Sequence, residues 1–135
     1  MRRATFLIAT AAACAAVAAP VALSAASPTR KLSDTSLHQT VHVSKGTELV
    51  VTLHSTYWTF NAPGGRVLTA LGSPQVSPAP IGMCVPGQGC GTVTERYRAV
   101  KDGTGTINAS RTTCGEALLC APSQRTYAVR VVVAH

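Results

Sequence analysis

The most regular feature of the sequence is a set of short runs in which apolar and polar side chains alternate. A period of two residues is the pattern of a β-strand with one buried face. Turn residues separate the runs, and none of the runs shows the 3.6-residue period of an amphipathic helix. The predicted strands are residues 37–43, 48–54, 58–60, 67–71, 92–100, 106–111 and 126–133. Seven strands with frequent turns predict an all-β fold, a β-sandwich, with a seven-strand barrel as the alternative.

The parity of each run predicts which side chains face the interior. The first two runs, residues 37–43 and 48–54, flank a turn that contains Gly46, so we expect them to form a hairpin. The side chains predicted to face inward are Leu37, Val41, Val43, Leu49, Val51, Leu53, Val93, Tyr97, Ala99, Tyr127, Val129, Val131 and Val133.

Three segments lack the alternation. Residues 72–91 hold four of the eight prolines and five of the eleven glycines, which predicts a long loop without regular strands. Residues 112–125 form a second irregular segment. Residues 27–36 are polar and aperiodic, and we interpret them as a linker. The folded domain is then predicted to occupy residues 37–135.

The N-terminal segment has the three-part pattern of a secretory signal. Two arginines supply positive charge, an apolar stretch follows, and small residues end it. We therefore predict a signal peptide at residues 1–26, cleaved near Ser24 or Ala26. The apolar stretch is shorter than the roughly 20 apolar residues that a transmembrane helix needs. The alternative is a lipobox at Cys14, which would make the protein a lipoprotein; in both cases we expect it to be secreted or held in the cell envelope.

Cysteine usage agrees with export. Four of the five cysteines follow the predicted signal peptide, and they form two pairs with five residues inside each pair. An even number in a small exported domain predicts disulfides, with three connectivities open. We favour Cys84–Cys90 and Cys114–Cys120, because each closes a short loop containing turn residues. Zinc is disfavoured, since paired ligands of structural zinc usually enclose two to four residues.

Residues that could carry chemistry are sparse. His38 and His54 would lie opposite each other in the predicted hairpin, but nothing completes a metal site, so we predict neither metal nor cofactor. The basic residues are dispersed and aromatic residues are few, which argues against nucleic-acid binding despite the net charge of +7. No nucleophile has a partner at motif spacing. No two carboxylates are placed so that they predict a catalytic pair, and we therefore expect no enzyme. The carboxylates that follow the signal peptide are Asp34, Glu48, Glu95, Asp102 and Glu116.

The pair Tyr57-Trp58 follows the second predicted strand. A buried tryptophan on the third strand is common in sandwiches, so we expect Trp58 in the core, with an exposed binding residue as the alternative. Tyr57 has the opposite parity and is predicted to lie on the surface.

Several stretches resemble the chagasin-type inhibitors of cysteine peptidases, which have an immunoglobulin-like fold. Together they cover residues 41–133. The family's glycine turn and second strand are matched by Val43-Ser44-Lys45-Gly46-Thr47-Glu48-Leu49-Val50-Val51-Thr52-Leu53, and its Asn-Pro-Thr-Thr-Gly-Tyr loop and following Trp have their place at Ser55-Thr56-Tyr57-Trp58. The family's glycine-rich loop and next strand resemble Gly87-Gln88-Gly89-Cys90-Gly91-Thr92 through Tyr97-Arg98-Ala99. Residues 101–107 resemble the turn and strand that follow.

The resemblance implies an immunoglobulin-like sandwich whose three loops enter the cleft of a papain-type peptidase. Two loops depart from the family: Asn-Pro-Thr-Thr-Gly is absent, and Arg-Pro-Trp is replaced by a segment that starts at Arg111 and has no Trp. We expect a monomeric, non-catalytic protein-binding domain, with an envelope or extracellular accessory module without inhibitory activity as the alternative. The partner-binding residues that the resemblance implies are Thr56, Tyr57, Trp58, Gly87, Gln88, Gly89, Arg111, Thr112 and Thr113.

Overall fold

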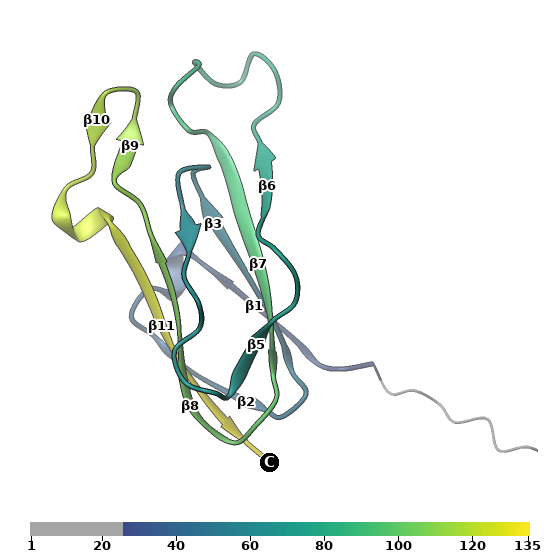
Figure 1. The fold of residues 1–135 in the computed structure, drawn as a ribbon. Coiled ribbons are helices and arrows are strands. Elements are labelled where there is room, and N and C mark those ends of the chain that lie inside the picture. The colour runs from purple at the N-terminus through teal and green to yellow at the C-terminus, as the bar shows by residue number, and fades with distance from the viewer. Residues whose placement is uncertain (1–25) are drawn as a thin grey trace, which may run out of the picture.

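The computed structural model describes residues 26–135, which form two β-sheets packed against each other (Figure 1). The predicted signal peptide, apart from its last residue, lies outside the described part of the chain. The elements are β1 (Thr29–Ser33), the 3-10 turn η1 (Asp34–Ser36), β2 (Thr40–Ser44), β3 (Glu48–His54), β4 (Thr59–Phe60), β5 (Leu68–Ala70), β6 (Gln75–Pro78), β7 (Gly91–Ala99), β8 (Gly103–Ser110), β9 (Thr113–Gly115), β10 (Leu118–Leu119), the 3-10 turn η2 (Pro122–Gln124) and β11 (Thr126–Ala134).

The strands divide into two main sheets. One has the order β1-β3-β7-β5, with β6 also paired to β7, and the other has the order β2-β11-β8-β4. The pairs β1–β3 and β2–β11 are parallel, whereas the remaining pairs in both sheets are antiparallel. Two open sheets confirm the predicted sandwich and exclude the barrel. A small hairpin of β9 and β10 lies outside both sheets.

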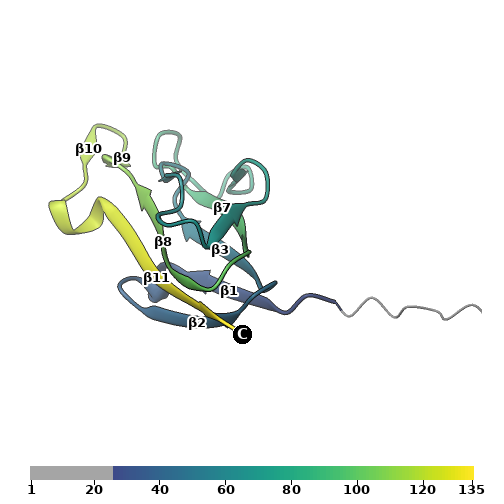
Figure 2. The same cartoon turned by 60° about the horizontal axis from the view of Figure 1, so that its bottom comes forward.

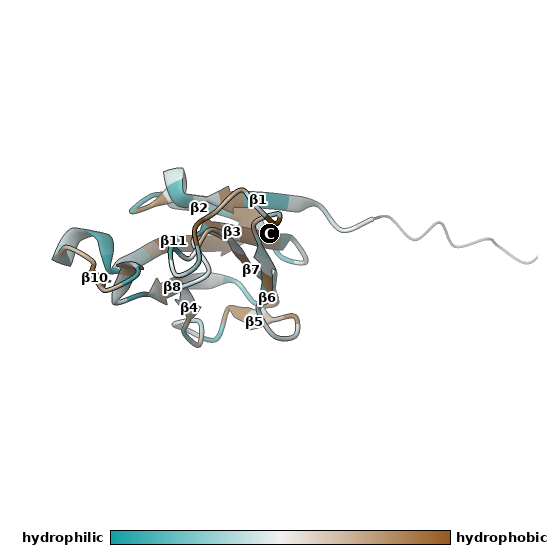
Figure 3. Ribbon diagram, turned by 90° about the horizontal axis from the view of Figure 1, so that it is seen from above, coloured by the Kyte–Doolittle hydropathy of each residue, from teal (hydrophilic) through white to brown (hydrophobic). Residues whose placement is uncertain are grey.

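The interior is formed by the inward faces of the long central strands. The alternating burial of β3, β7 and β11 confirms the parity predicted for these runs. Figure 3 looks down on the molecule from its loop end and shows hydrophobic residues of the strands near its centre. The buried apolar side chains are Leu32, Val41, Leu49, Val51, Leu53, Trp58, Val67, Leu68, Val93, Tyr97, Ala99, Ile107, Ala109, Tyr127, Val129, Val131 and Val133.

The prediction that residues 27–36 form a linker is wrong for most of these residues. Thr29–Ser33 is strand β1, which pairs in parallel with β3 and places Leu32 beside Val51 (Figure 2). Leu32 is 4% exposed. An edge strand that buries a single apolar side chain has no alternating pattern, so the sequence gives no period to detect.

The predicted hairpin between the runs 37–43 and 48–54 is also wrong. β2 pairs with β11 and β3 pairs with β7, so the two strands belong to opposite sheets. The turn between them is tied to both sheets, because Lys45 N donates to Ala134 O and Gly46 N donates to Ala99 O. Alternation specifies that one face is buried, but it does not specify which neighbour a strand takes. The predicted face-to-face approach of His38 and His54 falls with the hairpin.

The two irregular segments contain short strands that were not predicted. Within residues 72–91, β6 pairs with the upper half of β7, from Gln75 opposite Thr94 to Pro78 opposite Gly91. Its position at a sheet edge explains why a proline is tolerated there, since an edge strand needs only half of its backbone donors. Within residues 112–125, the chain forms the β9–β10 hairpin and η2.

One carboxylate lies among the buried residues. Glu95 follows Val93 on the inward face of β7 and is 4% exposed. Its Oε1 atom has no hydrogen-bond partner among residues 26–135. Burial raises the pKa of Glu95, and a hydrogen bond from the backbone of Arg96 only partly opposes this effect.

We predict that Leu32→Ala lowers the free energy of unfolding by about 2–3 kcal/mol, because it removes buried methyl groups and leaves a cavity beside β3. Its neighbour Lys31 is exposed on the same strand, so Lys31→Ala is the matched control and is expected to change stability by less than about 0.5 kcal/mol. Urea denaturation measures both. Equal, negligible effects would contradict a structural role for β1.

We predict that Glu95→Gln raises stability at neutral pH. The native pKa of Glu95 lies above its unfolded value, so the folded state binds more protons in the window between the two. The free energy of unfolding of the wild type therefore falls as pH rises through that window. Urea denaturation from about pH 4 to about pH 7 is expected to show this fall in the wild type and a smaller one in Glu95→Gln. Glu116→Gln, at an exposed carboxylate, is expected to keep the wild-type profile.

Candidate protein-binding loop end

Three loops lie together at one end of the sandwich, which we call the loop end (Figure 1). The first loop, residues 55–58, connects β3 to β4. The middle loop, residues 79–90, connects β6 to β7, and the third loop, residues 111–125, connects β8 to β11 and contains the β9–β10 hairpin. The antiparallel order of these strands brings the three connections to the same end, as the family resemblance implied.

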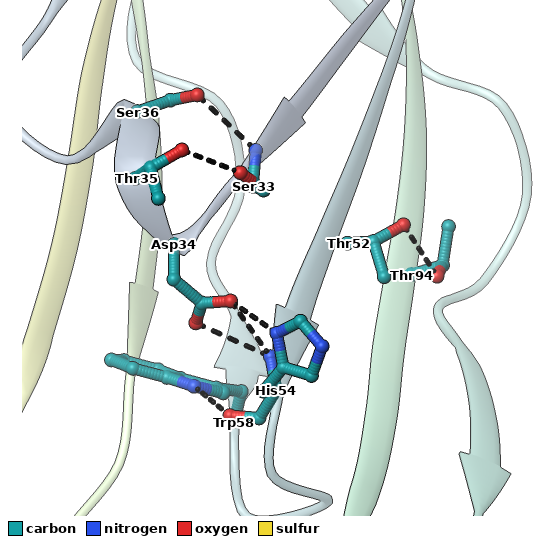
Figure 4. A network of polar contacts seen from close by, with 8 residues as sticks. All are labelled: Ser33, Asp34, Thr35, Ser36, Thr52, His54, Trp58 and Thr94. Atoms are coloured by element: carbon teal, nitrogen blue, oxygen red, sulfur yellow. Dashed lines mark hydrogen bonds and ion pairs between the residues drawn. The ribbon is translucent and has the colours of Figure 1, made fainter.

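The first loop is fixed at its base by the end of β3 (Figure 4). The Asp34 carboxylate accepts hydrogen bonds from the backbone N–H of His54, at 3.2 Å, and its Oδ2 lies 2.6 Å from His54 Nδ1. The indole Nε1 of Trp58 donates to His54 O at 2.9 Å. Between these anchors Ser55 has a φ of 101°, in a region that L-residues rarely adopt. The loop therefore leaves β3 in one constrained direction.

Trp58 and Arg111 join the first loop to the third. Trp58 is 8% exposed, which confirms its predicted place in the core and rules out the alternative of an exposed binding residue. The guanidinium carbon of Arg111 lies 4.3 Å from the centre of the indole ring, in cation–π geometry. Arg111 Nε also donates to Gln124 O at 2.9 Å. The side chains of these two predicted binding residues thus contact each other where the first and third loops meet.

Tyr57 joins the first loop to the middle loop. Its hydroxyl donates to Gly87 O at 2.5 Å, and the backbone N–H of Thr56 donates to Gly89 O at 2.8 Å. Gly89 has a φ of 66°, and a Cβ atom there would overlap the Tyr57 ring. Tyr57 is half-buried by this contact, whereas its parity had predicted a surface residue. Glycine is therefore required at position 89 for both backbone and packing reasons.

Two disulfides close the larger loops. Cys84–Cys90 lies in the middle loop and Cys114–Cys120 in the third, which confirms the local connectivity favoured from the sequence. The side chain of Glu116, between the third loop's cysteines, packs against Gly87 of the middle loop. Each loop is thus closed on itself and also contacts its neighbour. Disulfides of this kind fit an extracellular protein.

The tips of the middle and third loops expose large apolar side chains. Ile81 is 105% exposed and Met83 is 76% exposed, and Val85 continues this surface along the middle loop. Leu118 and Leu119 do the same on the β9–β10 hairpin. We call these five residues the apolar tips. These residues were not predicted as a binding surface. The signal that could have found them is the placement of Ile, Met and Leu inside loops too rich in Gly and Pro to bury them.

A groove lies between the two disulfide loops, and one further predicted site residue, Gln88, is among those that line it. The groove has a volume of about 400 Å³. Thr112 is exposed and Thr113 is half-buried at the base of the third loop. The remaining lining residues are Val85, Cys90, Cys114, Gly115, Glu116 and Leu118.

Within residues 26–135, no three His, Cys, Asp or Glu side chains gather closely enough to bind a metal ion. No helix in this part of the chain has the length and hydrophobicity needed to cross a membrane.

Comparison with solved structures identifies the fold. The structure is similar to EhICP2, a cysteine protease inhibitor from Entamoeba histolytica, with a TM-score of 0.57 and 19% sequence identity over 82% of this chain and 99% of that one. It is also similar to amebosin, with a TM-score of 0.55 and 17% identity over 79% of this chain and 99% of that one. The chain has the chagasin-type immunoglobulin-like fold. No protein-family profile and no curated protein matches the sequence.

We predict that Gly89→Ala destabilises the loop end more than Gly82→Ala. Both glycines belong to the middle loop and have positive φ, so each substitution costs about 1–2 kcal/mol of backbone strain. Only the methyl group at position 89 meets the Tyr57 ring, whereas position 82 is open, so Gly89→Ala is expected to cost about 1 kcal/mol more. Urea denaturation and the NMR shifts of the Tyr57 ring measure the difference. Identical behaviour of the two variants would contradict the packing of Tyr57 on Gly89.

Proposed function

We propose that this protein is an exported, non-catalytic binding domain that inhibits a papain-type cysteine peptidase through its loop end. The observation that carries the proposal is the set of apolar tips on two disulfide-closed loops. The fold similarity to a cysteine protease inhibitor supports the same partner class.

The first supporting argument is that the loop end is ordered before it meets a partner. Tyr57 links the first and middle loops, Arg111 stacks on Trp58 below them, and a disulfide closes each larger loop. Binding through flexible loops loses affinity because the loops must be ordered on association. Contacts that hold the loops in place in the free protein remove much of that entropic cost.

The second supporting argument is the chemistry of the apolar tips. Side chains such as Ile81 and Met83 gain free energy only when a partner removes them from water. Exposed apolar residues grouped at one place on a small protein mark an interaction surface. Three protruding loops fit a concave partner surface, and the active-site cleft of a peptidase has that shape. The partner would then be blocked by contact with the tips, without any covalent step.

The third supporting argument concerns the backbone of the middle loop. Gly82, Gly87 and Gly89 all have positive φ, so the loop turns repeatedly. A peptide that runs through it cannot take the extended conformation of a strand along its length. The loop can therefore enter a cleft without presenting a straight segment of backbone for cleavage.

We predict that the purified protein inhibits a papain-type peptidase reversibly, and that Ile81→Ser weakens inhibition by about tenfold or more, because it removes a central apolar contact. Val100→Ser is the matched control. Val100 is an exposed apolar residue in the turn between β7 and β8, outside the loop end, so this variant is expected to inhibit like the wild type. Steady-state inhibition constants for the wild type and both variants measure the effect.

Two results would contradict this function. The first is the absence of inhibition of several papain-type peptidases at micromolar concentrations of folded protein, which would favour an extracellular or envelope accessory module. The second is equal inhibition by the wild type and Ile81→Ser, which would show that another surface makes the contact. Neither result would alter the fold.

A further inference from the structure

A second concave site lies on the flank of the sandwich, away from the loop end. It is a cleft of about 170 Å³ at the open edge between the two sheets. On one side, pairing to β7 runs through Ala70 opposite Tyr97 and ends with the hydrogen bond from Leu71 N to Arg96 O, at 2.7 Å. It resumes at Gln75 opposite Thr94, so residues 72–74 form a bulge. On the other side, β4 ends at Phe60, and the chain stays along β8 through hydrogen bonds of Asn61 to Asn108 and of Gly64 to Thr106. The lining residues are Phe60, Asn61, Ala62, Pro63, Ala70, Gly72, Pro74, Glu95 and Tyr97.

The floor of this flank cleft carries a buried carboxylate. Glu95 lines the cleft and is 4% exposed, and its Oε1 atom has no hydrogen-bond partner among residues 26–135. The Tyr97 hydroxyl, from the same floor, has none within those residues either. A buried polar atom without a partner is costly, so it is seldom kept in a small core without a role. The rim of the cleft, by contrast, is exposed at Asn61, Ala62 and Pro74.

The walls around the carboxylate are apolar and aromatic. The rings of Phe60 and Tyr97, which both line the cleft, meet edge to face with centroids 6.4 Å apart. Ala62, Pro63, Ala70 and Pro74 supply the rest of the apolar wall. Aromatic faces attract cations, and a carboxylate in an apolar setting is a strong acceptor for a charged donor. Few placed polar groups within apolar walls are typical of small-ligand sites.

We propose that the flank cleft binds a primary alkylammonium group, with the charged nitrogen at Glu95 and the alkyl chain along Phe60 and the apolar rim. An ammonium in the cleft donates to the Glu95 carboxylate and neutralises the buried charge. A neutral ligand of the same shape would leave that charge uncompensated, and an anion would be repelled by it. The alkyl part fills space that aliphatic and aromatic side chains enclose. This site does not depend on the proposed peptidase inhibition.

The probe that tests the cleft is n-butylammonium chloride, titrated at neutral pH and constant ionic strength. We expect saturable NMR shifts of the Glu95 carboxyl carbon and of the backbone amides of residues 60–62 and 70–73. Uncharged n-butanol is expected not to saturate these shifts. A second arm uses the side chain of Nα-acetyl-lysine methylamide. Saturation by both amines would identify a lysine of a partner protein as an acceptable source, and saturation by n-butylammonium alone would identify a free amine.

Two variants make the test specific. Glu95→Gln keeps the shape of the side chain and removes its charge. We expect it to raise the dissociation constant of n-butylammonium by about tenfold or more. Glu116→Gln removes an exposed carboxylate at the loop end and is expected to bind like the wild type. If Glu95→Gln does not fold, Ala70→Leu narrows the cleft at an exposed rim position and is expected to abolish binding while leaving Glu95 in place.

Three results would overturn the proposal. One is a set of shifts that never saturates or that sodium chloride reproduces, which indicates a general salt effect. Another is equal affinity of n-butylammonium for the wild type and Glu95→Gln. The third is equal saturation by n-butanol, which would show that the cleft binds alkyl chains without regard to charge.

Discussion

Burial of one face of each sheet is the interaction on which the rest of the structure depends. The pairs β3–β7 and β8–β11 are the long antiparallel ladders, and their inward side chains meet between the sheets. Because both ladders have ends at the same side of the sandwich, they carry all three loops to one place. The edge strand β1 extends one sheet by pairing in parallel with β3, and its side chain Leu32 is part of the core.

The loop end is built by contacts that differ in kind from those of the core. Its loops bury little apolar surface of their own, so order comes from a few specific links: the Tyr57 hydroxyl on Gly87, Arg111 on Trp58, and two local disulfides. These links leave Ile81 and Met83 in water. The flank cleft shows the opposite arrangement, because there a polar group, Glu95, is buried and the apolar rim is exposed. Both sites keep groups in environments that folding alone does not favour, which is a mark of binding sites.

Much of the candidate site could be predicted from residue types and spacing, but the role of individual residues could not. The cysteine spacing favoured two local disulfides, and the structure has them. Parity placed Tyr57 on the surface, yet the absence of a side chain at Gly89 lets the ring pack against the middle loop. Parity also places Glu95 between Val93 and Tyr97, on the inward face of β7. An inward position for a glutamate is visible in the sequence and is unusual, because glutamate is normally exposed. The residue with this unusual position lines the flank cleft.

The sequence by itself determined the class of fold, the central strands and their buried faces. Alternation in β3, β7 and β11 is a local property, set by side chains two residues apart, and it survives in any all-β arrangement. Tertiary structure alone decided the partners of each strand. It put β2 and β3 in opposite sheets, made residues 29–33 an edge strand, and opened the flank cleft where residues 72–74 leave β7. The physical reason is that pairing and sheet packing join residues far apart in the chain, and a local pattern of hydrophobicity carries no record of which distant strand completes it.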